Sequence, residues 1–326
     1  MNGHDARLWA VAYHYVRDLP RTRFPGIKGK LTGDFEAQVD WLSERCEMAT
    51  LQSAMDFLAG RYQPERDLCL LTFDDGLKDH HANVLPLLAG RNIQGLFFLT
   101  TVCLEEHRVL PIHKNHFLMA GMVFDEYRDA FLRRLAAMSD QTPDPQDAER
   151  AKAAYPWDTQ DVAEFKFFLN YRVPEKLRVR VLDALFATFL GDEQAFAQDL
   201  YMSWDEAKEM QARGMVLGGH THQHVALSKL TDTEQAADLA ACADALRRRL
   251  SPQPLWPFTY PYGHGYSFNA VTVDNLRGQN FMCSFTTEPG SNPPGADLFT
   301  LHRIDTNDVL KYMQPARPAV AAGGDK

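Results

Sequence analysis

Two adjacent carboxylates, Asp74 and Asp75, stand between a short apolar segment, residues 70–73, and Gly76. In parallel α/β proteins the loops beyond the carboxyl ends of strands form the active-site rim, so acids at a strand end are typical of a functional site. Asp-Gly is also a common turn dipeptide, and a solvated turn is the alternative. Neighbouring side chains of an extended chain point to opposite sides, which suits one carboxylate as a metal ligand and the other as a nearby base.

Three of the twelve histidines, His220, His222 and His224, lie in a stretch of five residues after another apolar segment. His220 and His224 are four positions apart, so a helical or near-helical turn would place both imidazoles on one face and His222 elsewhere. Two imidazoles and one carboxylate match a catalytic divalent-metal site that keeps positions open for water and substrate. A polar His-rich loop is the alternative.

Two further groups of residues give weaker signals. Pro261 and Gly263 flank Tyr262 after an aromatic segment. Such residues fix a turn that could direct a backbone N–H into the site as a donor to an oxyanion, although an ordinary turn fits as well. His302 and Arg303 end a late apolar segment, where a surface basic pair is the alternative.

The segments that must position these groups alternate between apolar runs and helical patterns. A helix capped by Asp34 is expected after the first run, and capping boxes at residues 203–206 and 231–234 predict two more helix starts. This alternation predicts a parallel sheet with helices outside it. The predicted strands are residues 8–13, 68–73, 95–100, 215–218 and 258–260.

A long stretch, about 102–200, interrupts this alternation. It carries helical patterns at residues 124–138 and 174–190 and no convincing strand, so it is predicted to be a helical insertion. At roughly 150 residues per domain, the chain fits two domains or one elaborated domain. We expect a single catalytic domain over residues 1–314, with a disordered tail, residues 315–326, that is rich in Pro, Ala and Gly.

Within the insertion, His113, Lys114 and His116 form a small cluster. They could touch a substrate, but a surface loop is the favoured interpretation.

Composition excludes some classes of partner. The 34 Lys and Arg residues against 43 Asp and Glu residues give a net charge of −9, which argues against a nucleic-acid binder. The chain starts without a basic and then apolar leader and has no apolar run of membrane-spanning length, so we expect no membrane span and a cytoplasmic location. Five scattered cysteines without a C-x-x-C pair predict reduced, mostly buried thiols.

Three motifs in chain order resemble the polysaccharide deacetylase family, the carbohydrate esterases of family 4 with a NodB homology domain. They are Thr-Phe-Asp-Asp-Gly at residues 72–76, His-Thr-x-x-His at residues 220–224 and Tyr-Pro-Tyr-Gly at residues 260–263. Residues 13–16 also resemble the first-strand motif of many members. The resemblance implies a distorted (β/α)7 barrel, here with a large helical insertion.

The same resemblance implies a role for individual residues. Asp75, His220 and His224 would hold one divalent ion, Zn²⁺ before Co²⁺, Ni²⁺, Mn²⁺ or Fe²⁺, and Asp74 would be the catalytic base. The backbone N–H of Tyr262 would donate to the oxyanion. Substrate contacts are expected from Tyr260, Pro261 and His14.

The chain departs from the family pattern at two places. Thr259 stands where the family commonly has an arginine, and Leu301-His302-Arg303 replaces the late Leu-x-His motif. We expect Arg303 to take the place of the missing arginine beside Asp74, because its planar fork can hold a carboxylate. His302 is the nearest candidate for the general acid and His14 its rival, but adjacent strand residues point opposite ways, so His302 and Arg303 should not both enter the site.

These residues predict a metal-dependent hydrolase that removes an N-acetyl group from an amino sugar, an intracellular precursor of a surface glycan. The partner is then an N-acetylated sugar or glycan, and the oligomeric state stays open. Two alternatives share the same barrel: a deacylase acting on another amide or an O-ester, and an inactive glycan-binding homologue.

Overall fold

A parallel sheet forms the centre of the computed structural model, which describes residues 6–139, 148–154 and 158–313. Its order is β7-β6-β5-β4-β3-β1-β8, with β2 paired to β3 at the side. The predicted parallel α/β architecture is therefore confirmed. The strands are β1 Leu8–Tyr13, β2 Glu47–Met48, β3 Leu68–Phe73, β4 Gly95–Leu99, β5 Val216–Gly219, β6 Pro257–Thr259, β7 Cys283–Phe285 and β8 Ile304–Asp305.

The register of β1 on β3 determines which side chains leave the sheet together. These strands pair over their full length, from Leu8 with Leu68 to Tyr13 with Phe73. The residues that follow, His14 and Asp74, therefore emerge at the same edge.

A late segment, residues 301–305, nearly closes the curled sheet. Leu301 forms a parallel bridge with Phe285 of β7, and Ile304 pairs with Val11 of β1. The two residues between these contacts, His302 and Arg303, are therefore fixed at the seam, which is the place where this segment lies between β7 and β1.

Helices cover the outside of the sheet. Both predicted capping boxes are present, at the starts of α11 and α12. The first helix begins about one turn earlier than predicted, because Leu31 is its N-cap and Asp34 lies in its first turn. These helices are α1 Thr32–Arg45, α2 Leu51–Leu58, the π-helix η2 His80–Val84, α3 Leu85–Gly90, α11 Trp204–Ala212, α12 Asp232–Arg249, α13 Ala270–Gly278 and α14 Val309–Met313, with short 3-10 turns at Leu19–Arg21 and Leu227–Lys229.

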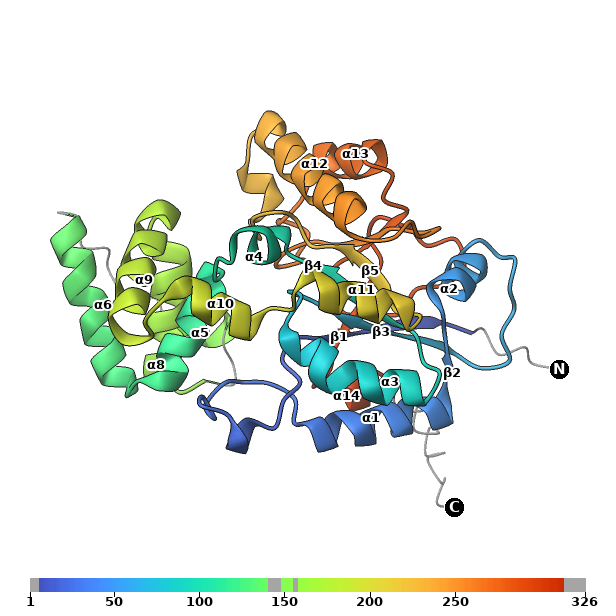
Figure 1. Cartoon of the computed structure of the whole chain (residues 1–326), viewed down its shortest axis with the longest axis horizontal. Coiled ribbons are helices and arrows are strands. Elements are labelled where there is room, and N and C mark those ends of the chain that lie inside the picture. Colours follow the sequence, from blue (N-terminus) through green and yellow to red (C-terminus); the bar gives the residue numbers. More distant parts are fainter. Residues whose placement is uncertain (1–5, 140–147, 155–157, 314–326) are drawn as a thin grey trace, which may run out of the picture.

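The stretch between β4 and β5 is helical, as predicted, and its described residues contain no strand. Figure 1 shows most of it as a lobe beside the sheet. The lobe has its own apolar core around Tyr127, Phe131 and Phe165. Its elements are α4 Thr101–Glu106, α5 Pro111–Gly121, α6 Phe124–Met138, α7 Ala148–Ala154, α8 Gln160–Phe167, the π-helix η3 Phe168–Arg172, α9 Glu175–Phe189 and α10 Glu193–Leu200.

Helix α5 connects this lobe to the barrel. On one side Phe117 packs edge-on against Tyr15 and Phe24, with ring centroids 6.0 and 5.1 Å apart. On the other side Leu118 belongs to the core of the lobe. Residues on the side of α5 that faces the barrel therefore lie near the ends of the strands.

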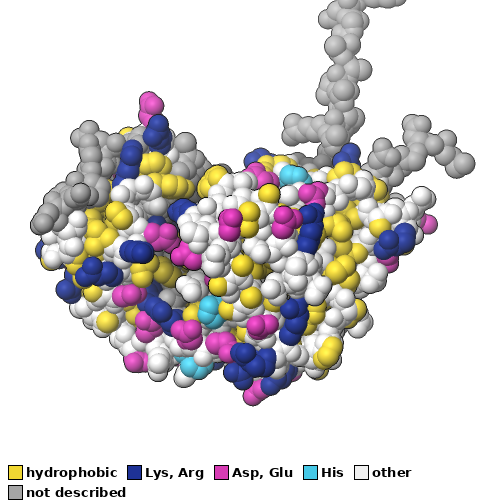
Figure 2. Space-filling view, turned by 90° about the horizontal axis from the view of Figure 1, so that it is seen from above, with side chains coloured by type: hydrophobic (Ala, Val, Ile, Leu, Met, Phe, Trp, Pro, Cys, Tyr) yellow, Lys and Arg dark blue, Asp and Glu magenta, His cyan; other side chains and the backbone are white. Residues whose placement is uncertain are grey.

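Other predictions have mixed outcomes. All five cysteines are free and buried, as expected. Within the described ranges, none of the helices combines the length and apolar character needed to cross a membrane. Figure 2 shows one face of the molecule, where Lys and Arg side chains are interspersed with Asp and Glu. The single domain over residues 1–314 stays a prediction, and the tail 315–326 lies outside the described residues.

Close packing at Gly218 gives a test of this fold. A Cβ at Gly218 would lie 2.5 Å from the Pro257 carbonyl oxygen and 2.8 Å from the Phe98 ring. We expect Gly218→Ala to lower the free energy of unfolding by about 1–3 kcal/mol, the usual cost of overpacking, measured by urea denaturation. The control is Gly33→Ala in α1, where a Cβ would meet no atom within 4 Å, so equal losses in both variants would contradict the packing.

Candidate functional site

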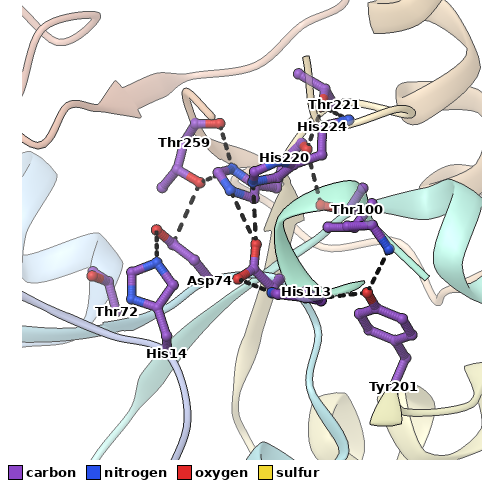
Figure 3. Close-up of polar contacts among 12 residues, drawn as sticks. His14, Thr72, Asp74, Thr100, His113, Tyr201, His220, Thr221, His224 and Thr259 are labelled. Carbon is purple, nitrogen blue, oxygen red and sulfur yellow. Dashed lines mark hydrogen bonds and ion pairs between the residues drawn. The ribbon is translucent and has the colours of Figure 1, made fainter. Parts of the chain in front are cut away.

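Asp75, His220 and His224 converge beyond the ends of β3 and β5. Figure 3 shows the two histidines side by side. Their candidate ligand atoms all lie within 4.8 Å of one another. Asp75 Oδ1 is 3.5 Å from His220 Nε2 and 3.4 Å from His224 Nε2. His222 points away, as predicted, with Nδ1 2.9 Å from Thr101 Oγ1.

The donor chemistry of this trio fits a divalent cation. His220 Nδ1 lies 2.9 Å from the Thr259 carbonyl oxygen and can donate to it, which leaves the Nε2 lone pair facing Asp75. Burial lowers the pKa of His220 to about 4, so the imidazole is neutral. Asp75 Oδ1 is buried and has no hydrogen-bond partner among the described residues. A neutral imidazole and an unpartnered buried carboxylate oxygen are ligands that a metal ion satisfies.

Unusual backbone conformations place these side chains. Asp75, Thr221, His224 and Tyr262 have φ angles of 74°, 64°, 57° and 64°, in the left-handed region that non-glycine residues occupy only where surrounding contacts hold them. The predicted helical turn at residues 220–224 is therefore wrong, because the segment is a loop with two left-handed residues. The two imidazoles still lie next to each other, edge to face, with ring centroids 4.9 Å apart.

Asp74 is held by a different partner from Asp75. Arg303 donates from Nη1 to Asp74 Oδ1 and from Nη2 to Asp74 Oδ2, both at 2.8 Å, and it is only 1% exposed. Burial alone would raise the pKa of Asp74, but the Arg303 guanidinium, together with the nearby His220 and His14, lowers this pKa to about 2. The structure thus places Arg303 beside Asp74, while Thr259 Oγ1 is 3.5 Å from Asp74 Oδ1.

The two candidate acids lie in different surroundings. His14 lines the cavity that contains the trio, and its Nε2 is 3.9 Å from Asp74 Oδ2. The side chain of His302 is exposed, with Nδ1 3.1 Å from the Glu288 carbonyl oxygen, and it is not among the residues that line this cavity. The alternation along the closing segment sends Arg303 inward and His302 outward. The structure therefore does not bring His302 to the site.

The insertion reaches the site through α5. The interpretation of His113, Lys114 and His116 as part of a surface loop is therefore wrong. His113 is 1% exposed, and its Nε2 is 3.1 Å from Asp75 Oδ2. Lys114 is equally buried and forms ion pairs with Asp183 and Glu193 at 2.6 and 2.8 Å. Helix α5 lacked an apolar repeat in the sequence because its buried face carries these polar side chains, each with a specific partner.

His116, one turn further along α5, lines the cavity. Burial and the neighbouring His113 lower its pKa to about 3, so this imidazole is neutral. It has no contact with Asp75 among the described interactions, and its Nδ1 is 3.4 Å from the Tyr15 hydroxyl.

The cavity above the trio has a volume of about 720 Å³. Tyr262 stands at it, 43% exposed, and its backbone N–H has no acceptor among the described residues. Tyr260 also borders the cavity but is 1% exposed, and its hydroxyl donates to the Phe299 carbonyl oxygen. Pro261 is buried and does not line the cavity. Of the predicted substrate contacts, only His14 is thus freely presented to it.

Comparison with known proteins decides the family. The model described as polysaccharide deacetylase matches residues 61–154 and 161–281. The chain belongs to this family. YxkH of Bacillus subtilis strain 168, whose name places it among the polysaccharide deacetylases, is 26% identical over 104 residues, 32% of this chain. That match spans 36% of YxkH.

Solved structures confirm the predicted distorted (β/α)7 barrel. Streptococcus pyogenes deacetylase PplD, in complex with acetate, is 14% identical with a TM-score of 0.58, covering 96% of this chain and 100% of PplD. IcaB from Ammonifex degensii is 23% identical with a TM-score of 0.54, covering 94% of each chain. The BpsB deacetylase domain from Bordetella bronchiseptica is 16% identical with a TM-score of 0.54, covering 94% and 97%.

The ion pair between Asp74 and Arg303 in this family member can be tested by measurements of stability alone. Arg303→Ala leaves a buried carboxylate unpaired, so we expect it to lower the free energy of unfolding by about 3–5 kcal/mol in urea denaturation. In an Asp74→Asn background the same substitution should cost less, with a coupling energy of about 1–3 kcal/mol. Strictly additive effects would contradict the pairing of these two side chains.

Proposed function

We propose that the protein is a metal-dependent hydrolase that removes the N-acetyl group from an amino sugar. The observation that carries the proposal is the separation of two adjacent carboxylates: Asp75 joins His220 and His224, while Asp74 is held apart by Arg303. Membership of the polysaccharide deacetylase family supports the same chemistry.

Asp75, His220 and His224 would hold one divalent ion, and Zn²⁺ suits a set of two nitrogen ligands and one oxygen ligand. Co²⁺, Ni²⁺, Mn²⁺ and Fe²⁺ bind similar sets. When bound, the ion supplies Lewis-acid polarisation of the amide carbonyl and lowers the pKa of water.

Asp74 accepts the proton of the attacking water. Arg303 keeps this carboxylate ionised and fixes its orientation through both oxygens. A base that is ordered before substrate arrives avoids the cost of reorganisation during the reaction.

The backbone N–H of Tyr262 donates a hydrogen bond to the carbonyl oxygen as it gains negative charge. Its left-handed conformation and the absence of another acceptor among the described residues support this role. A donor directed in this way is worth about 3–4 kcal/mol in the transition state.

His14 donates the proton that the leaving amine needs when the C–N bond breaks. It lines the cavity and approaches Asp74, whereas His302 faces away from it. The products are acetate and a free amino sugar, and the proton taken by Asp74 balances the one given by His14.

The substrate class is an N-acetylated sugar unit of a glycan or of a glycan precursor. Other amides or O-esters on the same barrel, and an inactive glycan-binding homologue, are the alternatives. The complete set of metal ligands and the separately held base favour catalysis over binding alone. Mass spectrometry of a panel of N-acetylated sugars and nucleotide sugars with the metal-loaded protein tests the proposal by the loss of an acetyl group.

Substitutions should separate metal binding from chemistry. We expect Asp75→Ala and His220→Ala to abolish both metal content and acetate release, because each removes a ligand. Asp74→Asn should retain the metal and lose at least about 100-fold in turnover, because the amide cannot accept the proton. Metal content by mass spectrometry and acetate release are measured together, and an Asp74→Asn enzyme with normal turnover would refute the assignment.

The two candidate acids can be compared directly. We expect His14→Ala to lower kcat/KM by about 10²–10⁴-fold, the usual contribution of a general acid. His302→Ala serves as the matched control and should stay within about twofold of the wild type, since its side chain lies outside the cavity. The opposite pattern in steady-state acetate release would return the role to His302.

A further inference from the structure

A chain of three hydrogen bonds links the inserted lobe to Asp75. The Leu110 backbone N–H donates to the Tyr201 hydroxyl oxygen over 3.0 Å. Tyr201 OH and His113 Nδ1 are 2.6 Å apart, and His113 Nε2 and Asp75 Oδ2 are 3.1 Å apart. Figure 3 shows the central contact of this chain, between Tyr201 and His113.

The first bond sets the direction of the others. Because the Tyr201 oxygen accepts from Leu110, its own proton is free to be donated to His113 Nδ1. With Nδ1 accepting from Tyr201, the His113 ring carries a proton on Nε2 and donates it in a hydrogen bond to Asp75 Oδ2. Each member of the chain is buried, so water does not compete for these bonds.

This arrangement makes the two oxygens of Asp75 unequal. Oδ2 is occupied by His113, whereas Oδ1 faces His220 and His224 and has no hydrogen-bond partner among the described residues. Without His113, Oδ2 would be a buried anionic atom with no donor, and the carboxylate could rotate about its Cβ–Cγ bond.

The lobe is built to keep His113 in place. Lys114, the next residue, is tied to Asp183 of α9 and Glu193 of α10. Phe117 packs on Tyr15 at the barrel. Residue 113 is therefore fixed from both sides of α5.

We infer that His113 is a positioning residue, supplied by the inserted lobe, that holds Asp75 so that Oδ1 alone is directed at the metal. The inference rests on the proposed function, because it takes Asp75 as a metal ligand. Partners that orient the ligands of a metal typically change its affinity by about 10–100-fold when they are removed.

The test measures metal affinity without substrate, using Zn²⁺ competition against a chromophoric chelator and the visible spectrum of the Co²⁺ form. We expect His113→Phe to raise the Kd for Zn²⁺ by about 10–100-fold and to shift the Co²⁺ bands. Tyr201→Phe should raise Kd by a smaller factor, since it loosens His113 without touching Asp75. His113→Gln should recover most of the affinity, because its amide can donate to Asp75.

The matched control is His116→Phe, one turn along the same helix at the wall of the same cavity but without a contact to Asp75. It should leave the Kd for Zn²⁺ within about twofold of the wild type. Three outcomes would overturn the inference. The first is wild-type affinity in both His113→Phe and Tyr201→Phe, and the second is an equal loss of affinity in His113→Gln and His113→Phe. The third is a loss in His116→Phe equal to that in His113→Phe. A wild-type protein that binds no divalent metal would instead refute the proposed function itself.

Discussion

The bidentate ion pair between Asp74 and Arg303 is the interaction on which the site depends. Two neighbouring carboxylates buried in one cavity repel each other, and without compensation one of them would take up a proton. Arg303 neutralises Asp74 through both oxygens. Asp75 faces His220 and His224 instead. The two adjacent carboxylates therefore have separate partners, which the proposed reaction requires.

The topology of the sheet explains how such a pair arises from distant parts of the chain. The register of β1 on β3 brings His14 out beside Asp74. The closing segment, residues 301–305, contacts β7 at one end and β1 at the other, which directs Arg303 inward at the seam. Helix α5 completes the wall with His113 and His116. The insertion is thus part of the site as well as an extension of the barrel.

Much of this arrangement could be predicted from the sequence. The Asp74-Asp75 pair and the His220 and His224 spacing depend on residue type and position at strand ends, and the alternation rule correctly kept His302 and Arg303 from sharing the site. The conformation of residues 220–224 could not be predicted, because a four-residue spacing suits both a helical turn and a loop with left-handed residues.

The contribution of α5 to the site could not be predicted from the sequence either. Its buried face carries His113 and Lys114, which look like surface residues until their partners are known. The partners lie far away in the chain, so local sequence patterns do not reveal them. They are Asp75 and Tyr201 for His113, and Asp183 and Glu193 for Lys114. Only the packing of α5 between lobe and barrel brings them together.

The most direct test of this division between the carboxylates is diffraction at the zinc absorption edge from crystals of the protein loaded with Zn²⁺. We predict one anomalous peak per chain, bounded by Asp75 Oδ1, His220 Nε2 and His224 Nε2, with Asp74 outside the coordination shell and still paired with Arg303. A peak that Asp74 ligates together with Asp75, or one located away from the two histidines, would contradict the account.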